Sequence, residues 1–373
     1  MHRFFTRLAL NTVLISFLVS LVATLLIIRF DHLHAHVSGD HDTGGVQKFH
    51  AQSVPRIGGV GIMIALLAQG IWLLFRQSDL GVPFMIMLFA SLPAFVGGLV
   101  EDLTKRVGVL ARLALTMCAA LLGFWLLNAT LTRIDVPLLD DLLRYGVVAL
   151  LFTAVAVGGI ANAINIIDGF NGLAGMVAMM ILAALGYVAF ILGDSLLWML
   201  SLAAVGSILG FFVWNYPRGM IFLGDGGAYL IGFLIGEISV LLVSRHPEVS
   251  PWFPLLLVIY PVFETLFSIY RRKFIKGVSP GMPDALHLHT LVFRRLVRWA
   301  VGVGSTAQLK QNAATSPYLW ILCSMSVFPA LFFWRNTMAL VVCVIGFATL
   351  YIWIYQRIVR FKSPRMLINR ERR

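Results

Sequence analysis

Charged side chains are scarce in this sequence. Asp, Glu, Lys and Arg make up only 12% of the residues, whereas a soluble domain contains roughly 25%. Hydrophobic residues reach 59% and the mean hydropathy is +0.88, values that exclude a water-soluble fold. No long polar stretch is present that could form a second domain. We therefore predict a single all-α, polytopic integral membrane domain over residues 1–373.

Cysteine is also rare, and its placement implies no disulfide framework. The three cysteines, Cys118, Cys323 and Cys343, all lie inside apolar segments. Cysteines in such positions act as small apolar side chains. We expect them to contribute packing and no chemistry.

Long apolar runs are abundant. Most are close to the roughly 20 residues that a helix needs to cross a bilayer. The run at 8–28 is too long for a cleaved signal peptide, and no small-x-small cleavage site follows it. We expect eleven transmembrane helices, at 8–30, 57–76, 82–100, 108–127, 142–160, 173–192, 196–214, 220–243, 251–270, 317–335 and 337–357.

The unusual polar residues lie between these segments, and alternation places all of them on one side of the bilayer. Of the 29 Lys and Arg residues, 22 are nearest to that side and 7 to the other. Positive residues gather on the cytoplasmic face, so we expect the polar clusters, a long loop at 271–316 and a basic tail at 358–373 to be cytoplasmic. Arg3 and Arg7 favour the opposite orientation. The net charge of +12 thus reflects topology and anionic lipid at the tail, and not nucleic-acid binding.

The strongest cluster is the stretch 162–173. Asn162, Asn165, Asp168 and Asn171 recur every three residues, so neighbours share one face of a helix. Two glycines in the same stretch let the backbone approach a ligand closely. Carboxylate and amide oxygens presented together suit Mg²⁺. A polar seam between two helices is the alternative, although a carboxylate is an expensive residue at such a seam.

Two further acidic clusters could also bind a metal ion. Asp225 lies between glycines, downstream of Asn215, and can approach a metal or a diphosphate without obstruction. The alternative is a glycine turn capped by the carboxylate. Glu101 and Asp102 end an apolar segment, and two adjacent carboxylates suit a proton acceptor or a metal ligand. A solvated helix end is the bland alternative there.

Basic residues and histidines complete the set. Arginine binds phosphate oxygens in forked geometry, and histidine donates to phosphate or binds metal. Basic residues are also common at any cytoplasmic helix end, which is the alternative. The candidates for phosphate or sugar contact are Lys48, His50, Arg56, Arg272, His287 and His289.

Acidic groups for a cation, basic groups for phosphates and adjacent lipid together suit phosphoryl transfer to a lipid-borne acceptor. A transporter is the alternative from another class, but such proteins often show inverted repeats, and none is visible by eye. A scaffold for glycan assembly would not need Asp168 and Asp225 together.

At this point the chain resembles a known family, the polyprenyl-phosphate N-acetylhexosamine-1-phosphate transferases of glycosyltransferase family 4. The resemblance runs from about Lys48 to His289, with the motifs in the family's order. Residues 162–173 are similar to its N-x-x-N-x-x-D-G-x-D-G-L signature. Residues 222–227 are similar to F-x-G-D-x-G, and residues 283–289 to P-D-x-x-H-x-H-H.

The resemblance implies that undecaprenyl phosphate attacks the β-phosphorus of a UDP-N-acetylhexosamine. The products are then undecaprenyl-diphosphate sugar and UMP, with Mg²⁺ required and Mn²⁺ able to replace it. It also implies a multi-pass protein of the bacterial inner membrane with its active site facing the cytoplasm, and leaves a homodimer open. It assigns catalysis to Glu101, Asp102, Asp168 and Asp225, metal binding to Asn165, Asp168 and Asp225, and substrate binding to Lys48, His50, Arg56, Asn162, Asn171, Asn215, Arg272, His287 and His289.

Three positions depart from the family pattern. Glu101 stands where Asp is usual, Asn171 replaces a second Asp, and Thr290 stands where a further His is common. Glu and Asn can still act as ligands, so we expect activity to survive. The sequence from Lys276 to the His-x-His element looks closer to the branch that initiates O-antigen or common-antigen polysaccharides than to the peptidoglycan branch. Which N-acetylhexosamine is carried stays open.

Overall fold

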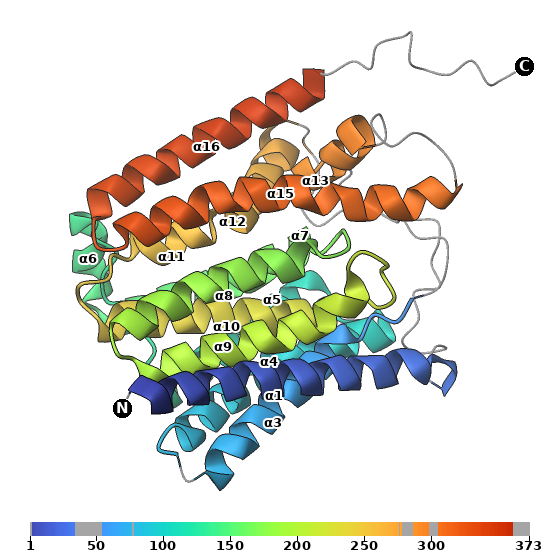
Figure 1. Ribbon diagram of the computed structural model, residues 1–373. Coiled ribbons are helices and arrows are strands. Elements are labelled where there is room, and N and C mark those ends of the chain that lie inside the picture. Colours follow the sequence, from blue (N-terminus) through green and yellow to red (C-terminus); the bar gives the residue numbers. More distant parts are fainter. Residues whose placement is uncertain are drawn as a thin grey trace, which may run out of the picture.

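The computed structural model describes residues 2–33, 54–76, 78–275, 277, 286–297 and 305–360. In these ranges the long elements are all helices that lie side by side in one bundle (Figure 1). In chain order they are α1 (His2–Arg29), α3 (Gly58–Phe75), α4 (Gly81–Thr104), α5 (Val109–Leu127), α6 (Pro137–Leu143), α7 (Gly146–Ile167), α8 (Leu173–Ile191), α9 (Ser195–Asn215), α10 (Gly224–Arg245), α11 (Trp252–Leu257), α12 (Ile259–Tyr270), α13 (Leu288–Leu291), α15 (Ser305–Phe333) and α16 (Thr337–Arg360), with π-helical segments η1 (Arg271–Ile275) and η2 (Val292–Val297). Ten helices within the described ranges are long and apolar enough to cross a membrane. The predicted all-α polytopic fold is confirmed.

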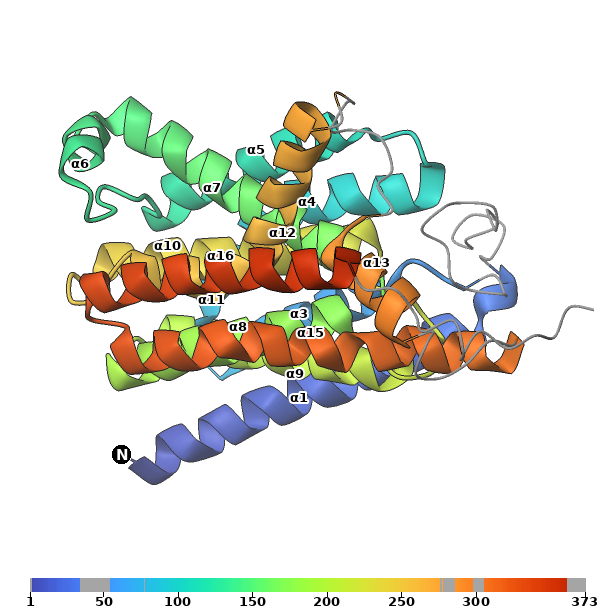
Figure 2. The ribbon, with the colours of Figure 1, turned by 90° about the horizontal axis from the view of Figure 1, so that it is seen from above.

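The remaining expected crossing, 251–270, is divided between two short helices. Helix α11 ends at Leu257 and α12 begins at Ile259. Pro261 explains the break, because a proline ring collides with the carbonyl group four residues earlier, at Leu257. Helix α12 then runs across the direction of the long helices instead of along them (Figure 2). The expected loop at 271–316 likewise contains helical pieces, namely η1, α13, η2 and the first turns of α15.

Helix α10 forms the core of the bundle. Its residues from Gly224 to Val243 are all buried, and α3, α4 and α7 pack against it. Small residues permit this close packing: a Cβ added at Gly227 would lie 2.9 Å from the Cα of Gly59 in α3. Helices in lipid pack through such small residues because lipid supplies no hydrophobic driving force between them. The start of α10 is therefore fixed relative to its neighbours.

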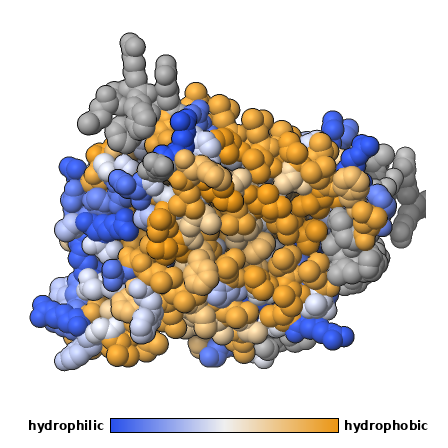
Figure 3. All heavy atoms as spheres, turned by 90° about the horizontal axis from the view of Figure 1, so that it is seen from below, coloured by the Kyte–Doolittle hydropathy of each residue, from blue (hydrophilic) through white to orange (hydrophobic). Residues whose placement is uncertain are grey.

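Successive long helices run in alternating directions, so their ends gather at two opposite ends of the bundle. Helix α1 begins at the left in Figure 1, whereas α16 ends at the right. The ends of α4, α7 and α9 and the start of α10 lie on the same side as the end of α16. One face of the molecule is a broad hydrophobic band with hydrophilic residues gathered toward its two ends (Figure 3). This is the surface expected of a protein embedded in a bilayer.

Candidate active site

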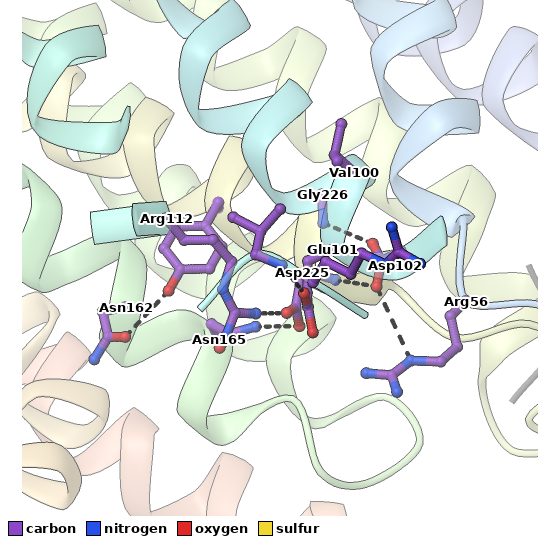
Figure 4. A network of polar contacts seen from close by, with 12 residues as sticks. Arg56, Val100, Glu101, Asp102, Arg112, Asn162, Asn165, Asp225 and Gly226 are labelled. Carbon is purple, nitrogen blue, oxygen red and sulfur yellow. Dashed lines mark hydrogen bonds and ion pairs between the residues drawn. The ribbon is translucent and has the colours of Figure 1, made fainter. Parts of the chain in front are cut away.

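The polar clusters predicted from the sequence meet where α4 and α7 end and α10 begins. Helix α4 carries Asp102 in its last turn, Asp168 directly follows α7, and Asp225 lies in the first turn of α10. In Figure 4 the side chains of Asp102 from α4, Asn165 from α7 and Asp225 from α10 lie close together. Residues more than 100 positions apart in the chain thus form one site, as the alternation of the helices predicts.

Asp102 caps the N-terminus of α10. Its two carboxylate oxygens accept hydrogen bonds from the backbone N–H groups of Asp225 and Gly226, both at 2.9 Å. The side chain is 1% exposed, and the Nε atom of Arg56 lies 4.0 Å from it. An anion at a helix N-terminus is stabilised by the helix dipole. Asp102 therefore fixes the backbone position of Asp225, independently of any catalytic role of its own.

The side chain of the neighbouring Glu101 points toward the turn after α4 and not toward the start of α10. Its Oε2 atom accepts a hydrogen bond of 2.7 Å from the backbone N–H of Val107, so it organises the turn between α4 and α5. The two adjacent carboxylates do not act as an equivalent pair in this geometry. Their catalytic roles stay predictions.

Asp225 is surrounded by a hydrogen-bonded network (Figure 4). Its Oδ1 atom accepts from the amide Nδ2 of Asn165 at 2.8 Å, and its Oδ2 atom forms an ion pair with Arg112. The Arg112 guanidinium lies over the ring of Tyr229, 5.6 Å from its centroid. The Tyr229 hydroxyl in turn donates to Oδ1 of Asn162 at 3.2 Å. Both predicted asparagines of α7 therefore face the same cluster.

Asp168 lies just beyond the last turn of α7. Burial raises the pKa of its carboxyl from the ordinary 3.8 to about 7, although the Arg56 guanidinium lowers this pKa. A nearby cation favours the charged form of a carboxyl group. The charge of Asp168 therefore depends on what binds beside it.

Asn171 and Asn215 brace the loops around the site. The Asn215 side chain accepts from the Gly172 N–H at 2.7 Å and donates to the Ile221 carbonyl at 2.8 Å. The Asn171 amide donates to the Pro217 carbonyl at 3.2 Å. Both asparagines are nearly fully buried, so the structure shows them joining the loops after α7 and α9. Substrate contact by either one stays a prediction.

Helix α15 supports the 168–172 loop from the other side. Its Asn312 side chain accepts from the Asn171 N–H at 2.9 Å, and its Ser316 hydroxyl donates to the Asn171 carbonyl at 2.6 Å. The Trp320 indole donates to the Gly172 carbonyl at 3.2 Å. Asn312 and Ser316 lie in the segment that was expected to be loop, whereas Trp320 lies in the predicted span 317–335, so hydropathy did not reveal the role of the first two.

The two predicted histidines lie together beside the same loop. The rings of His287 and His289 stack with centroids 5.1 Å apart and planes 5° from parallel. His289 also meets the ring of Phe170 edge-on at 5.6 Å, and Phe170 lies two positions after Asp168 in the chain. Arg272 is buried in η1. Lys48 and His50 lie outside the described residues.

Residues not singled out by the sequence also belong to this region. Arg112 was not among the predicted site residues, yet it forms an ion pair with Asp225. Glu264 lies in an expected transmembrane segment and accepts from Nδ1 of His287 at 3.1 Å. An ionisable residue inside an apolar segment marks a functional position by default, so this signal was present in the sequence.

Oxygen donors suited to a divalent cation gather between α7 and α10. They are the carboxyl of Asp225, to which the Asn165 amide donates, and the carboxyl of Asp168, which lies close enough to Asp102 for the two charges to interact. Among the described residues no group of three His, Cys, Asp or Glu is placed to hold a metal ion. Mg²⁺ is usually held by one or two carboxylates together with substrate phosphates and water, and seldom by a full protein cage. The donor set therefore fits Mg²⁺.

An apolar groove of about 610 Å³ leads away from this site. Asn162 lines it at the end near Asp225, and Trp252 lines it near the opposite end of the bundle. Its walls come from α7, α10 and α12, and rim residues such as Val155 and Leu266 are 58% and 57% exposed. The groove therefore opens on the outer surface of the bundle, beside a charged site.

Comparison with known proteins identifies the family. The model of "Glycosyl transferase family 4" matches residues 84–243. A protein of Bacillus subtilis (strain 168) named "Probable undecaprenyl-phosphate N-acetylglucosaminyl 1-phosphate transferase" is 30% identical over 286 residues, which cover 74% of this chain and 76% of that protein. The chain belongs to glycosyl transferase family 4. The resemblance predicted from the motifs is confirmed, and membership in the family makes the chain an enzyme.

Two further relatives are similar to this chain over about 70% of its length. A Thermotoga maritima protein named undecaprenyl-phosphate alpha-N-acetylglucosaminyl 1-phosphate transferase is 29% identical over 253 residues, covering 68% of this chain and 72% of its own. A phospho-N-acetylmuramoyl-pentapeptide-transferase of Streptococcus pneumoniae (strain CGSP14) is 26% identical over 270 residues, covering 70% and 80%. The chain is thus more similar to the first kind of relative than to the second, as the motifs predict.

Proposed function

We propose that this protein transfers N-acetylhexosamine 1-phosphate from a UDP-sugar to undecaprenyl phosphate. An oxygen of the lipid phosphate would attack the β-phosphorus of the donor, and the bond between that phosphorus and the bridging oxygen would break. The bridging oxygen would leave with UMP, and undecaprenyl-diphosphate sugar would remain in the membrane. The observation that carries the proposal is the ion pair of Asp225 and Arg112, which lies beside Tyr229 and so close to Asn162 at the end of an apolar groove.

Each substrate has a matching part of the site. The groove is apolar and open along the bundle, as a prenyl chain requires, and the acidic cluster lies at the end where the lipid phosphate would be. Arg56 and Arg112 can bind phosphate oxygens, because a guanidinium presents several donors in a fixed fork. Asp168, Asp225 and Asn165 would hold Mg²⁺, which when bound supplies positive charge to the diphosphate.

We also propose where the protein acts, in which pathway, and how much of the chain forms the transferase domain. The excess of Lys and Arg on the site's side supports a cytoplasmic active site in a bacterial inner membrane. We place the reaction at the start of lipid-linked surface polysaccharide synthesis of the O-antigen type, with residues 1–373 forming one transferase domain. Mn²⁺ replacing Mg²⁺, a homodimer, and cytoplasmic placement of the 271–316 loop and the 358–373 tail remain predictions.

The test uses purified protein with undecaprenyl phosphate, Mg²⁺ and a panel of UDP-N-acetylhexosamines. We expect UMP and one lipid-linked sugar, detected by mass spectrometry, and loss of both with EDTA or in Asp225→Asn. Asp194→Asn is the matched control, because Asp194 caps α9 at the opposite end of the bundle and should leave turnover intact. No product from any donor in folded protein would refute the proposal.

A further inference from the structure

One buried carboxylate holds the segment with the two histidines, formed by His287 and the start of α13, to the bundle. Glu264 of α12 is 1% exposed. Its Oε1 atom accepts from Nδ1 of His287 at 3.1 Å and from the Leu288 backbone N–H at 2.8 Å. Its Oε2 atom accepts from the hydroxyl of Tyr351 in α16 at 2.8 Å. Three donors thus converge on a single side chain, which favours its ionised form.

A purely structural role does not require this carboxylate. A charged group inside a membrane protein is costly unless it is paired and hydrogen-bonded. A glutamine at 264 could fill the same space against α16 and still accept a hydrogen bond through its amide oxygen. The feature that only a carboxylate supplies is a charged acceptor for the imidazole of His287.

The contact with Glu264 also determines the tautomer and the ring orientation of His287. A carboxylate has no proton to donate, so Nδ1 of His287 must be the donor and must carry a hydrogen. The other ring nitrogen, Nε2, is then the atom that faces away from Glu264. A carboxylate on one imidazole nitrogen fixes the tautomer and the ring orientation, as it does for metal-binding and catalytic histidines.

The orientation is passed on to the site by stacking. His289 lies flat against His287, with the planes 5° apart. A Cβ added at Gly169 would lie 3.6 Å from Nε2 of His289, so this ring reaches the residue next to Asp168. Arg271 holds the residue that precedes this segment, since it donates to the Leu286 carbonyl and to the hydroxyl of Tyr355.

We propose that Glu264 is a positioning residue that orients His287, and through it His289, toward the phosphates of the sugar-nucleotide donor. The inference rests on the proposed function for the identity of the donor. The geometry of Glu264 and His287 stands without it. The expected consequence is that the charge of Glu264 affects donor binding more strongly than acceptor binding.

The first experiment measures UDP-N-acetylglucosamine binding by calorimetry, and KM for donor and acceptor, in Glu264→Gln. Gln keeps the size and one acceptor oxygen but removes the charge, so we expect donor affinity to fall about tenfold or more with the acceptor KM changed less than threefold. Tyr351→Phe is the matched control, because it removes the hydrogen bond to Oε2 of the same carboxylate and leaves His287 in place. We expect it to change donor affinity less than threefold, and Glu264→Asp to fall between wild type and Glu264→Gln.

A double-mutant cycle separates positioning from general loosening of the fold. If Glu264 acts through His287, Glu264→Gln adds nothing once His287→Asn is present, because coupled residues are not additive. Additive losses, or equal losses in Glu264→Gln and Tyr351→Phe, would overturn the inference.

A second measurement needs no folded variant of Glu264. Nitrogen-15 NMR of the histidine side chains reports which ring nitrogen carries the proton, and the chain has 9 histidines. The signal lost in His287→Asn assigns the residue. We expect a proton on Nδ1, and a neutral ring protonated on Nε2 alone would refute the positioning role. Wild-type protein that transfers no sugar while His287 shows the expected proton would refute the proposed function and leave the contact standing.

Discussion

Replacing Asp102 with Asn distinguishes two roles for this carboxylate, the capping of α10 and a direct part in proton transfer. Each carboxylate oxygen accepts one backbone N–H in the structure, from Asp225 and from Gly226. Asn keeps one acceptor oxygen but turns an amide donor toward the second N–H. One buried N–H group at the start of α10 is then left unpaired.

The magnitude follows from these two contacts. A hydrogen bond to a charged group contributes about 1.5–3 kcal/mol, and a buried unpaired donor costs about 1–3 kcal/mol. The remaining neutral hydrogen bond offsets part of this loss, so we expect Asp102→Asn to lower the free energy of unfolding by about 2–4 kcal/mol. At about 2 °C per kcal/mol for a large domain, the melting temperature should fall by about 4–8 °C.

The assay is a thermal scan of purified protein in detergent, followed by tryptophan fluorescence, with turnover measured well below both melting temperatures. Turnover should fall too, because Asp225 is displaced when the start of α10 loosens. Asp194→Asn tests the same substitution at a cap with one backbone partner, the Leu197 N–H at 3.0 Å, and should keep its turnover. A variant at position 102 that melts like wild type but has no activity would refute the capping argument and favour proton transfer.

The remaining predictions concern the groove, the pH response and the tail. Gly159 lines the groove and a Cβ there meets nothing within 4 Å, so Gly159→Leu should raise the KM for undecaprenyl phosphate several-fold and leave the donor KM unchanged; an unchanged acceptor KM would argue against a prenyl chain in the groove. Burial raises the pKa of Asp168 from 3.8 to about 7, so the folded protein binds this proton more tightly than the unfolded protein does. Without divalent cation, the free energy of unfolding should therefore fall as pH rises from about 4 to about 7. Thermal scans of wild type and Asp168→Asn check this, and an equal slope in both would contradict it. Arg360→Ala, at the exposed end of α16, should leave kcat within twofold, and a large loss would show that the end of α16 does more than contact lipid.

Hydropathy placed most helices correctly, because burial in lipid requires long apolar runs. The segment expected at 108–127 is α5 (Val109–Leu127) almost to the residue. The errors occur where polar residues continue a helix. Helix α7 runs to Ile167 instead of ending near 160, since Asn162 and Asn165 find partners on α10.

The start of α15 was also misplaced by hydropathy, because polar residues precede its apolar run. It begins at Ser305, whereas the apolar run begins near Pro317. The polar residues between these points are tolerated because Asn312 and Ser316 bond to the backbone of the 168–172 loop. Such partners lie more than 140 positions away in the chain, and no local pattern reveals them.

The candidate site was predictable in its residue types and less so in their roles. The spacing of Asn162, Asn165 and Asp168 indicated one helix face, and the first two do face α10. That Asp102 caps a helix and Asn215 joins two loops depends on contacts between distant segments. Sequence motifs mark such positions but do not distinguish residues that bind a ligand from residues that hold structural elements in place.

The break between α11 and α12 has a consequence for how the two substrates reach the site. Because α12 leaves the direction of the bundle, the groove opens sideways, where Val155 and Leu266 are exposed. A prenyl acceptor would then diffuse in two dimensions and enter without leaving the bilayer, while a nucleotide would arrive from water at the ends of α4 and α7. With separate routes, neither substrate obstructs the other, and initial-rate kinetics should show random binding order with the lipid product leaving along the path by which the acceptor came.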